Sequence, residues 1–497
     1  MKLTIDRESA IGIKDQIVSE LQSRIETSIL KAGQRLPSVR KMAATIQVSP
    51  MTVVKAYETL EAAGLVEKIH GKGTFVKKKK HTVTMEDQGD RIEGSEWQDT
   101  IEDYVQRSGY VQRTLMSRHQ TGINLTLAAL HHRFVPTRKI LDKFQEWLVG
   151  RENELGQYPP VEGDPRLIKA VQSYMLDRGI EAPEDQIIIT TGTQLALNLI
   201  AQTYIGPGDV VVVESPTFPG AIDVFKNRGA VIVDVPIVQG GVRTDLLLDI
   251  CERYPVKLFF TMATFQNPTS YSYSHETSME LLDLAKEFNF LIVEDDTWGD
   301  LSYEKPERSL KDLDQDDRVI YVSGFSKVYG PSIRLSAITS GERIHSRLLS
   351  MKANLDSGAP LMNQLMLAPY LDSLEDKQHL IWLRHELKAL RDAVHKHMKK
   401  HMPAYVKWDL PKGGLVFWLT LPHGFDVQLL YYRAITEENI SFLVGHNCYV
   451  GAKGNNQLRL CYSYGEEVDV MVGVERLAKL IESVRNTMKS GVQNPIF

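Results

Sequence analysis

The sequence predicts a multidomain chain: a small, mainly helical N-terminal domain with a β-hairpin, then a large α/β domain with a smaller α+β C-terminal part. Three observations predict this division. The chain has 497 residues, too many for one hydrophobic core. Residues 1–80 hold 15 Lys and Arg against 8 Asp and Glu, a net charge of +7, which leaves −12 on the remainder. Short helical patterns fill the first part, whereas apolar strands alternate with helices after about residue 119.

The N-terminal domain is expected over residues 1–77. Apolar residues recur every four positions within residues 11–30, which predicts an amphipathic helix. Two shorter helices are expected over residues 39–46 and 51–63, each preceded by a serine that can cap it. Residues 65–76 alternate in polarity and turn at a Gly-Lys-Gly sequence, as a β-hairpin does. This order is typical of a winged helix-turn-helix, whose second helix lies in the major groove of double-stranded DNA.

Candidate DNA contacts lie at the start of that helix, on the helix before it and at the hairpin tip. Each polar side chain taken alone is more simply a solvated surface residue, so the prediction depends on their order along the chain. The positive charge suits phosphate contacts, although the four lysines of residues 77–80 are equally consistent with a solvated linker. The candidates are Arg40, Ser49, Met51, Thr52, Lys55, His70, Gly71 and Lys72.

Residues 78–118 are expected to form a partly helical linker to a domain over residues 119–497. Continuous apolar strands between helices predict a mainly parallel sheet covered on both faces. From about residue 379 the pattern changes to a smaller α+β part. The expected strands of the sheet are residues 187–190, 210–213, 231–233, 258–261, 290–293 and 319–322.

Polar residues near these strands have the chemistry that pyridoxal phosphate requires: a lysine, an acid for the pyridine nitrogen, a donor to the phenolate oxygen and a stacking ring. Lys327 would form the Schiff base, and Asp295 would pair with the ring nitrogen. Asn267 would donate to the phenolate oxygen, and Phe218 would stack on the ring. Arg459 would bind the carboxylate of an amino-acid effector. Individually these residues have commoner structural roles, so their order along the chain supports the prediction.

A phosphate site is expected where a strand ends and a helix begins. Gly192, Thr193 and Gln194 would direct backbone N–H groups and the positive end of the helix dipole at an anion. Ser326 would add a hydroxyl, and Arg334 would add a guanidinium. A Gly-Thr-Gln sequence alone is a weak turn motif, so this prediction also rests on its position after a strand.

Two family resemblances agree with these patterns. Residues 10–77 resemble the winged-helix domain of the GntR family of bacterial regulators, through RLPSVRKMAATIQVSPMTVVKAYETLEAAGLVEKIHGKGTFV. Residues 120–490 resemble fold-type I, subgroup I aminotransferases, which are pyridoxal-phosphate-dependent α/β enzymes. The motifs are YPPVEGDPRLIKAV, TTGTQLAL, ESPTFPGA, QNPTS, VEDDTWGDL, GFSKVYGPSIRL, PKGGLVFWL and NQLRLCYSYG. Joined in this order, the two parts resemble the MocR/GabR subfamily of GntR regulators.

The resemblance implies a head-to-tail homodimer in which Tyr158 reaches the cofactor phosphate of the other subunit. Three positions depart from the family patterns. Trp298 stands where many relatives place a tyrosine near the phenolate oxygen, and Gly324 replaces a serine often used for the phosphate. Pro50 stands where many GntR members carry an arginine, so one DNA contact is in doubt.

The resulting hypothesis is a transcriptional regulator that senses an amino-acid-like effector through an aldimine at Lys327 and so alters operator binding. The alternative is an active aminotransferase with an accessory DNA-binding domain. A charged N-terminus and the lack of a membrane-spanning apolar run predict a cytoplasmic protein without membrane contact. The three cysteines, Cys251, Cys448 and Cys461, lack metal-ligand spacing, and no metal site is predicted.

Overall fold

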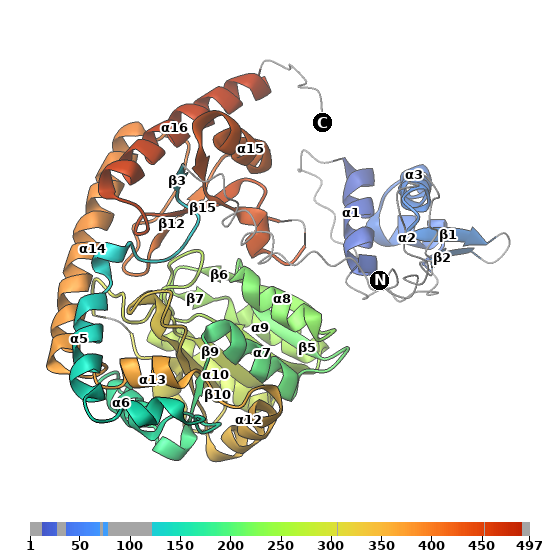
Figure 1. The fold of residues 1–497 in the computed structure, drawn as a ribbon. Helices are drawn as coiled ribbons and strands as arrows, with labels where there is room; N and C mark the ends of the chain where they lie inside the picture. The colour runs from blue at the N-terminus through green and yellow to red at the C-terminus, as the bar shows by residue number, and fades with distance from the viewer. Residues whose placement is uncertain are drawn as a thin grey trace, which may run out of the picture. The chain divides into compact units, whose positions relative to one another are not determined.

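The computed structural model describes residues 12–26, 36–69, 73–77, 122–305, 307–451 and 453–489. The chain divides into two compact units, Met1–Val105 and Gln106–Phe497. Figure 1 shows both units, coloured along the chain.

The first unit contains a helix-turn-helix followed by a hairpin. Ser38 caps the second helix, since its side chain accepts a hydrogen bond from the backbone N–H of Lys41. Ser49 caps the third helix in the same way, by accepting from Thr52, and Pro50 occupies the first helical position. The elements are α1 (Ile13–Glu26), α2 (Val39–Ile46), α3 (Pro50–Ala62), β1 (Val66–Ile69) and β2 (Gly73–Val76).

One hydrophobic core holds these elements together. Tyr57 of α3 is buried and its hydroxyl donates a 2.9 Å hydrogen bond to the carbonyl of Pro37, which fixes α3 against the segment before α2. The strands β1 and β2 pair antiparallel, with Val66 opposite Val76. The buried apolar residues are Ile17, Leu21, Leu36, Met42, Ala43, Ile46, Val53, Ala56, Tyr57, Leu60, Val66 and Val76.

The second unit is built on an eight-stranded sheet with the strand order β4-β11-β10-β9-β8-β5-β6-β7. The run β10-β9-β8-β5-β6 is parallel, which confirms the predicted sheet. The strand β11 was not expected, and it runs antiparallel to both of its neighbours. The strands are β4 (Ile187–Thr190), β5 (Val210–Ser215), β6 (Val231–Val238), β7 (Gly241–Val242), β8 (Val256–Thr261), β9 (Leu291–Asp295), β10 (Val319–Gly324) and β11 (Ser336–Thr339).

Helices cover both faces of this sheet, as Figure 1 shows. Val211 and Val213 of β5 face a core shared with α7 (Thr193–Tyr204), α8 (Pro219–Asn227) and α12 (Glu342–Leu355). Val210 and Val212 face a second core shared with α9 (Thr244–Arg253) and α10 (His275–Glu287). Remaining helices before the C-terminal part are α5 (Thr137–Leu148), α6 (Pro165–Leu176), α11 (Leu310–Leu313) and α13 (Leu361–Leu367), with 3-10 turns η1 (His132–Phe134), η2 (Glu152–Gly156), η3 (Glu184–Gln186) and η4 (Phe325–Lys327).

The C-terminal part is α+β, as expected, and begins with the long helix α14. Its three-stranded antiparallel sheet has the order β12-β15-β14. The start of the second unit also contacts the C-terminal part, because β3 (Ile123–Asn124) pairs in parallel with β13 (Ile440–Ser441). No described helix combines the length and apolar character needed to cross a membrane. The elements are α14 (Leu374–His401), β12 (Val416–Thr420), α15 (Val427–Glu438), β14 (Leu443–Val444), η5 (Gly445–Cys448), β15 (Gln457–Cys461) and α16 (Glu467–Lys489).

Candidate functional site

Lys327 closes the turn η4, directly after the central strand β10. Its side chain is partly buried, and Nζ donates a 2.6 Å hydrogen bond to the carbonyl oxygen of Ala128. Loss of water around the amine, followed by the positive charge of Arg459, lowers the pKa of Lys327 to about 8. A larger fraction of this amine is therefore neutral near pH 7 than for a lysine in water.

Asp295 is the last residue of β9 and is buried. Its Oδ1 accepts hydrogen bonds from the backbone N–H of Thr297, at 3.1 Å, and from the Thr297 hydroxyl. Burial raises the pKa of Asp295 to about 6, although the bonds from Thr297 and the charge of Lys327 oppose this effect. A buried carboxylate of this kind gains most from a cationic partner, such as a protonated pyridine nitrogen.

A chain of hydroxyl groups links Asp295 to the start of α7. The Thr297 hydroxyl, which donates to Asp295, also lies 3.2 Å from the Thr193 hydroxyl. Gly324 leaves space for this pair, since a Cβ there would lie 2.6 Å from Oγ1 of Thr193 and 2.9 Å from Oγ1 of Thr297. The predicted acid and the predicted phosphate site therefore belong to one connected group.

The start of α7 offers an anion site of the expected kind. Gly192 precedes the helix with a φ of 83°, a conformation that favours glycine, and a Cβ there would lie 2.9 Å from Nη2 of Arg334. The first N–H groups of a helix lack partners within the helix. The Ser326 hydroxyl is buried and has no hydrogen-bond partner among the described residues. These donors fit a phosphate group, and Lys327 and Asp295 fit the rest of pyridoxal phosphate.

Phe218 and Gln194 lie together at the start of α8. Gln194 donates a 3.2 Å hydrogen bond from Nε2 to the carbonyl oxygen of Gly220. A Cβ on Gly220 would lie 2.6 Å from both the Phe218 ring and Oε1 of Gln194, so both side chains contact this glycine. Phe218 remains only partly buried, which leaves ring surface for stacking.

Arg459 lies on β15 and is buried at 5% exposure. Nη1 donates a 2.7 Å hydrogen bond to Oδ1 of Asn267, and Nη2 donates a 2.6 Å bond to the carbonyl oxygen of Thr126. Its Nε is buried without a hydrogen-bond partner among the described residues. Because a guanidinium has five N–H donors, Arg459 retains donors for a carboxylate.

The remaining two predicted cofactor residues differ sharply in exposure. Tyr158 is 90% exposed, whereas Trp298 is 1% exposed. The Trp298 ring lies against Gly414, where a Cβ would be 3.0 Å from the indole. Within a single chain, Tyr158 therefore lies outside the group of buried site residues.

Sequence reasoning missed three contributors to this site. Thr297 lies two residues after Asp295, and a hydroxyl so close to a strand-end acid was the available signal. Thr126 and Ala128 contribute only carbonyl oxygens, to Arg459 and Lys327. Side-chain patterns carry no signal for backbone acceptors of this kind.

Three DNA-binding candidates, Met51, Thr52 and Lys55, lie on α3, and Ser49 caps this helix. Met51 is 62% exposed and Lys55 is also exposed, whereas the opposite side of the helix is buried. The hydroxyls of Ser49 and Thr52 lie 2.8 Å apart and the first caps the helix, so part of their bonding is internal. The candidates at the hairpin tip, His70, Gly71 and Lys72, lie outside the described residues, as does the Arg40 side chain.

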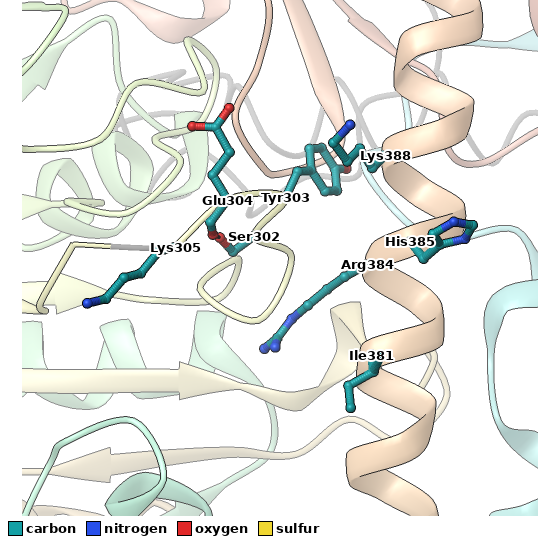
Figure 2. Close-up of a pocket in the computed structure, with 8 residues that line it drawn as sticks. All are labelled: Ser302, Tyr303, Glu304, Lys305, Ile381, Arg384, His385 and Lys388. Carbon is teal, nitrogen blue, oxygen red and sulfur yellow. Dashed lines mark hydrogen bonds between the residues drawn. The ribbon is translucent and has the colours of Figure 1, made fainter.

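Two cavities lie away from the cofactor residues. One of about 410 Å³ lies between residues 302–305 and α14, where Figure 2 shows Arg384 directed toward that loop. Arg384 is already engaged, since Nε donates a 2.7 Å bond to the carbonyl oxygen of Asp300. The other, about 470 Å³, adjoins residues 269–274 and 409–412. None of the predicted cofactor residues lines either cavity.

Comparison with known proteins gives a separate match for each unit. The family described as "Aminotransferase class I and II" matches residues 122–477, and "Bacterial regulatory proteins, gntR family" matches residues 13–76. The uncharacterized HTH-type transcriptional regulator YisV of Bacillus subtilis is 28% identical over 97% of this chain and 98% of its own. The two units thus occur together, in one chain, in a known protein described as a regulator.

The larger unit also matches enzymes. Aromatic-amino-acid aminotransferase 1 of Thermococcus litoralis is 32% identical, over 67% of this chain and 81% of its own. The crystal structure of Pyrococcus horikoshii kynurenine aminotransferase in complex with PMP has a TM-score of 0.73 at 29% identity. That match covers 78% of this chain and 96% of the enzyme.

Proposed function

The chain belongs to the aminotransferase class I and II family and carries a gntR-family domain, and on this premise we propose that its cofactor site senses an amino-acid-like effector. The chain is a pyridoxal-phosphate-dependent transcriptional regulator that binds DNA. The sensing step, the effector's chemical class and the site residues below form the proposal. The observation that carries it is that the Lys327 amine and the Arg459 guanidinium bind the same short segment, since Lys327 donates to the carbonyl of Ala128 and Arg459 to the carbonyl of Thr126.

When bound, pyridoxal phosphate supplies an aldehyde that condenses reversibly with primary amines. Lys327 would hold the cofactor through its amine, whose lowered pKa increases the neutral, nucleophilic fraction. Asp295 would hold the proton of the ring nitrogen, with Thr297 fixing the carboxylate by two hydrogen bonds. Asn267 would donate to the phenolate oxygen from its amide nitrogen, since its Oδ1 already accepts from Arg459.

The phosphate would bind at the start of α7. Backbone N–H groups of Thr193 and Gln194, the free hydroxyl of Ser326 and the guanidinium of Arg334 form a suitable donor set. The N–H of Gly192 already donates a 2.9 Å hydrogen bond to the carbonyl of Thr190, so Gly192 would contribute its backbone conformation instead. Two aromatic residues complete the pocket. Phe218 would stack on the ring, and Trp298 would close the side of the ring near the phenolate oxygen.

Arg459 would bind the effector's carboxylate, and the effector's amine would then take the place of Lys327. This exchange requires both a primary amine and an anionic group in one small molecule, which defines the effector class. Ligand binding changes DNA affinity only when the ligand binds the two conformations of the protein with different affinity. The released Lys327 amine and the newly paired Arg459 are the two local differences that would favour one conformation.

The functional protein would be a homodimer with a head-to-tail arrangement. Tyr158 is 90% exposed in one chain, although the family resemblance assigns it to the phosphate of a second subunit. A dimer would bury this side chain, and its hydroxyl would donate a hydrogen bond to the cofactor phosphate of the other subunit. It would also allow two winged helices to bind one operator, through the exposed Met51 and Lys55 and the half-buried Thr52 of α3 and through the hairpin tip.

A second candidate function is aminotransferase activity, since the chain is 32% identical to an enzyme described as an aromatic-amino-acid aminotransferase. Release of keto acid at enzyme-like turnover, on the order of 1 s⁻¹ or more, would favour this function. Slow release, with a stable change in DNA affinity, would favour sensing.

Borohydride reduction tests the cofactor attachment and the sensing step together. Reduction of the wild-type protein is expected to fix a phosphopyridoxyl group on the peptide that contains Lys327, as mass spectrometry would detect. Lys327→Ala should carry none, whereas Lys388→Ala, which removes a lysine from α14, should match the wild type. An effector should protect Lys327 from labelling. Labelling of another lysine in the wild type would refute the assignment.

A further inference from the structure

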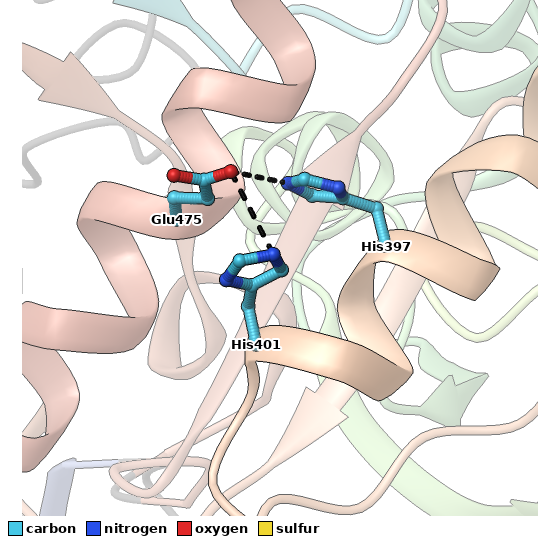
Figure 3. Close-up of side chains that lie close together, drawn as sticks. All are labelled: His397, His401 and Glu475. Atoms are coloured by element: carbon cyan, nitrogen blue, oxygen red, sulfur yellow. Dashed lines mark ion pairs between the residues drawn. The ribbon is translucent and has the colours of Figure 1, made fainter.

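A second group of ligand-type side chains lies on two helices of the C-terminal part, apart from the cofactor residues. Figure 3 shows His397 and His401 on α14 facing Glu475 on α16. One ligand atom from each of these three side chains lies within 4.8 Å of the others. The sequence analysis predicted no metal site, because it considered only the spacing of the cysteines. The pair of histidines four residues apart was the available signal, whereas Glu475 lies much further along the chain.

The positions of these residues follow from helix geometry. His397 and His401 are four residues apart, which places both imidazoles on one face of the last turn of α14. Helix α16 packs beside α14 and presents Glu475 to that face. Two imidazoles on one helix and a carboxylate from a neighbouring helix form a common ligand set for Zn²⁺.

The distances suit a tetrahedral ion. Oε1 of Glu475 lies 3.1 Å from Nε2 of His397 and 3.7 Å from Nε2 of His401. Ligand atoms held about 2.0–2.1 Å from a tetrahedral Zn²⁺ lie about 3.3–3.4 Å from one another. Small side-chain rotations that shift these atoms by a few tenths of an ångström would therefore bring Nε2 of each histidine to the required distance from Oε1 of Glu475.

The hydrogen bonding of the group also indicates a missing partner. Both Nε2 atoms are shielded from water and have no hydrogen-bond partner within the described part of the chain. Oε1 of Glu475 lies within ion-pair distance of both Nε2 atoms, but it forms a hydrogen bond with neither. A cation between the three atoms would accept the lone pairs of both imidazoles and the charge of the carboxylate.

The two imidazole rings lie 4.4 Å apart, centroid to centroid, so both can contact one ion. A divalent cation would bind both imidazoles and the carboxylate at once.

We propose that His397, His401 and Glu475 bind one divalent transition-metal ion, with Zn²⁺ the best match to this ligand set. The side chains remain 20%, 26% and 38% exposed, so water can reach a fourth position on the ion. Bound metal would join the last turn of α14 to α16. This proposal is independent of the sensing function, because it involves none of the cofactor residues.

Zinc titration of the untagged, full-length holo-protein, after chelator treatment, tests the site. Zn²⁺ would be added in competition with a chromophoric chelator, to the wild type and to His401→Ala, Glu475→Gln and His385→Ala. The last variant is the matched control, since His385 lies on the same helix, is 79% exposed and pairs with Glu386. We expect one Zn²⁺ equivalent in the wild type and in the control, and a Kd at least about 10-fold higher in the two site variants.

Cobalt provides a spectroscopic check of geometry. Co²⁺ in a tetrahedral site absorbs strongly in the visible range, so the difference spectrum should show these bands in the wild type and in His385→Ala only. Unchanged cofactor absorbance and circular dichroism would show that the site variants are folded. Equal Zn²⁺ affinity and stoichiometry in all four folded proteins would overturn the proposal.

Discussion

Arg459 and Asn267 lie 192 residues apart, yet Nη1 of Arg459 donates a 2.7 Å hydrogen bond to Oδ1 of Asn267. The bond joins strand β15 of the C-terminal part to the loop after β8 of the large sheet. One of these residues is assigned to the effector's carboxylate and the other to the cofactor's phenolate oxygen. Under the proposed function, effector binding at Arg459 would therefore be directly connected to a cofactor contact.

Arg459→Gln should weaken the binding of an amino-acid effector by about 10–100-fold, since hydrogen bonds to charged groups contribute about 1.5–3 kcal/mol. The Kd would be measured from the change in cofactor absorbance on titration with each of the common amino acids. The control ligand is an amine with the same structure as the best amino acid but without its carboxylate. Its affinity should change little. An equal loss for the amine and the amino acid would rule out carboxylate binding by Arg459.

Asp295→Asn should stabilise the cofactor-free protein at neutral pH and weaken cofactor binding. Burial raises the pKa of Asp295 to about 6 from 3.8, so its favourable contribution to folding is complete below pH 3.8 and lost as the pH rises through 6. The difference in unfolding free energy between variant and wild type should therefore grow between pH 4 and 6, to about 1–3 kcal/mol, and then stay constant. Denaturant titration at several pH values measures this difference in unfolding free energy. A difference that does not depend on pH would show that the raised pKa of Asp295 is not its cause.

Gly324→Ala should lower the affinity for the cofactor. The new Cβ would lie 2.6 Å from Oγ1 of Thr193 and would separate Thr193 from Thr297, which disconnects the start of α7 from the Asp295 carboxylate. Equilibrium dialysis would measure the Kd for pyridoxal phosphate. We expect this Kd to rise about 10-fold or more, which is the effect of losing one well-placed hydrogen bond. Gly206→Ala is the control, because Gly206 does not have a positive φ and a Cβ there would make only an ordinary 3.7 Å contact with Oδ2 of Asp209. Unchanged affinity in Gly324→Ala would show that the threonine pair does not support the cofactor site.

Lys55→Ala should weaken DNA binding in a salt-dependent way. If the exposed Lys55 ammonium contacts a phosphate, its removal lowers the magnitude of the slope of log K against log salt by about 0.9 per bound protomer. Fluorescence anisotropy with the gene's own upstream DNA at several salt concentrations gives this slope. Lys388→Ala, on α14 of the other unit, should leave it unchanged. A loss of affinity with no change in slope would place Lys55 away from the phosphates.

Both family motifs and local patterns predicted the elements that carry the site. The capped helix that ends at Ile46 has the predicted bounds, and Ser49 begins the next helix as expected. Strand β11 was missed, because its sequence Ser-Ala-Ile-Thr lacks the continuous apolar run by which the equally short strand β4 was predicted.

The site contacts that the sequence did not predict were missed for a different physical reason. The bond from Lys327 to the carbonyl of Ala128 joins residues 199 positions apart, and neither the backbone acceptor nor its distance leaves a trace in the sequence. The contact of Arg459 with Thr126 is of the same kind. Tyr158 is 90% exposed in the single chain, and its proposed contact with the cofactor phosphate would require a second chain.

The most direct test of the central claim is the DNA affinity of the full-length holo-protein with and without an amino-acid effector. We predict that an effector which changes the cofactor absorbance also changes the Kd for upstream DNA, by about 5–150-fold, the usual range for coupled sites. Lys327→Ala should bind the same DNA with an affinity that the effector does not alter. A wild-type Kd unaffected by an effector that demonstrably occupies the cofactor site would contradict the account.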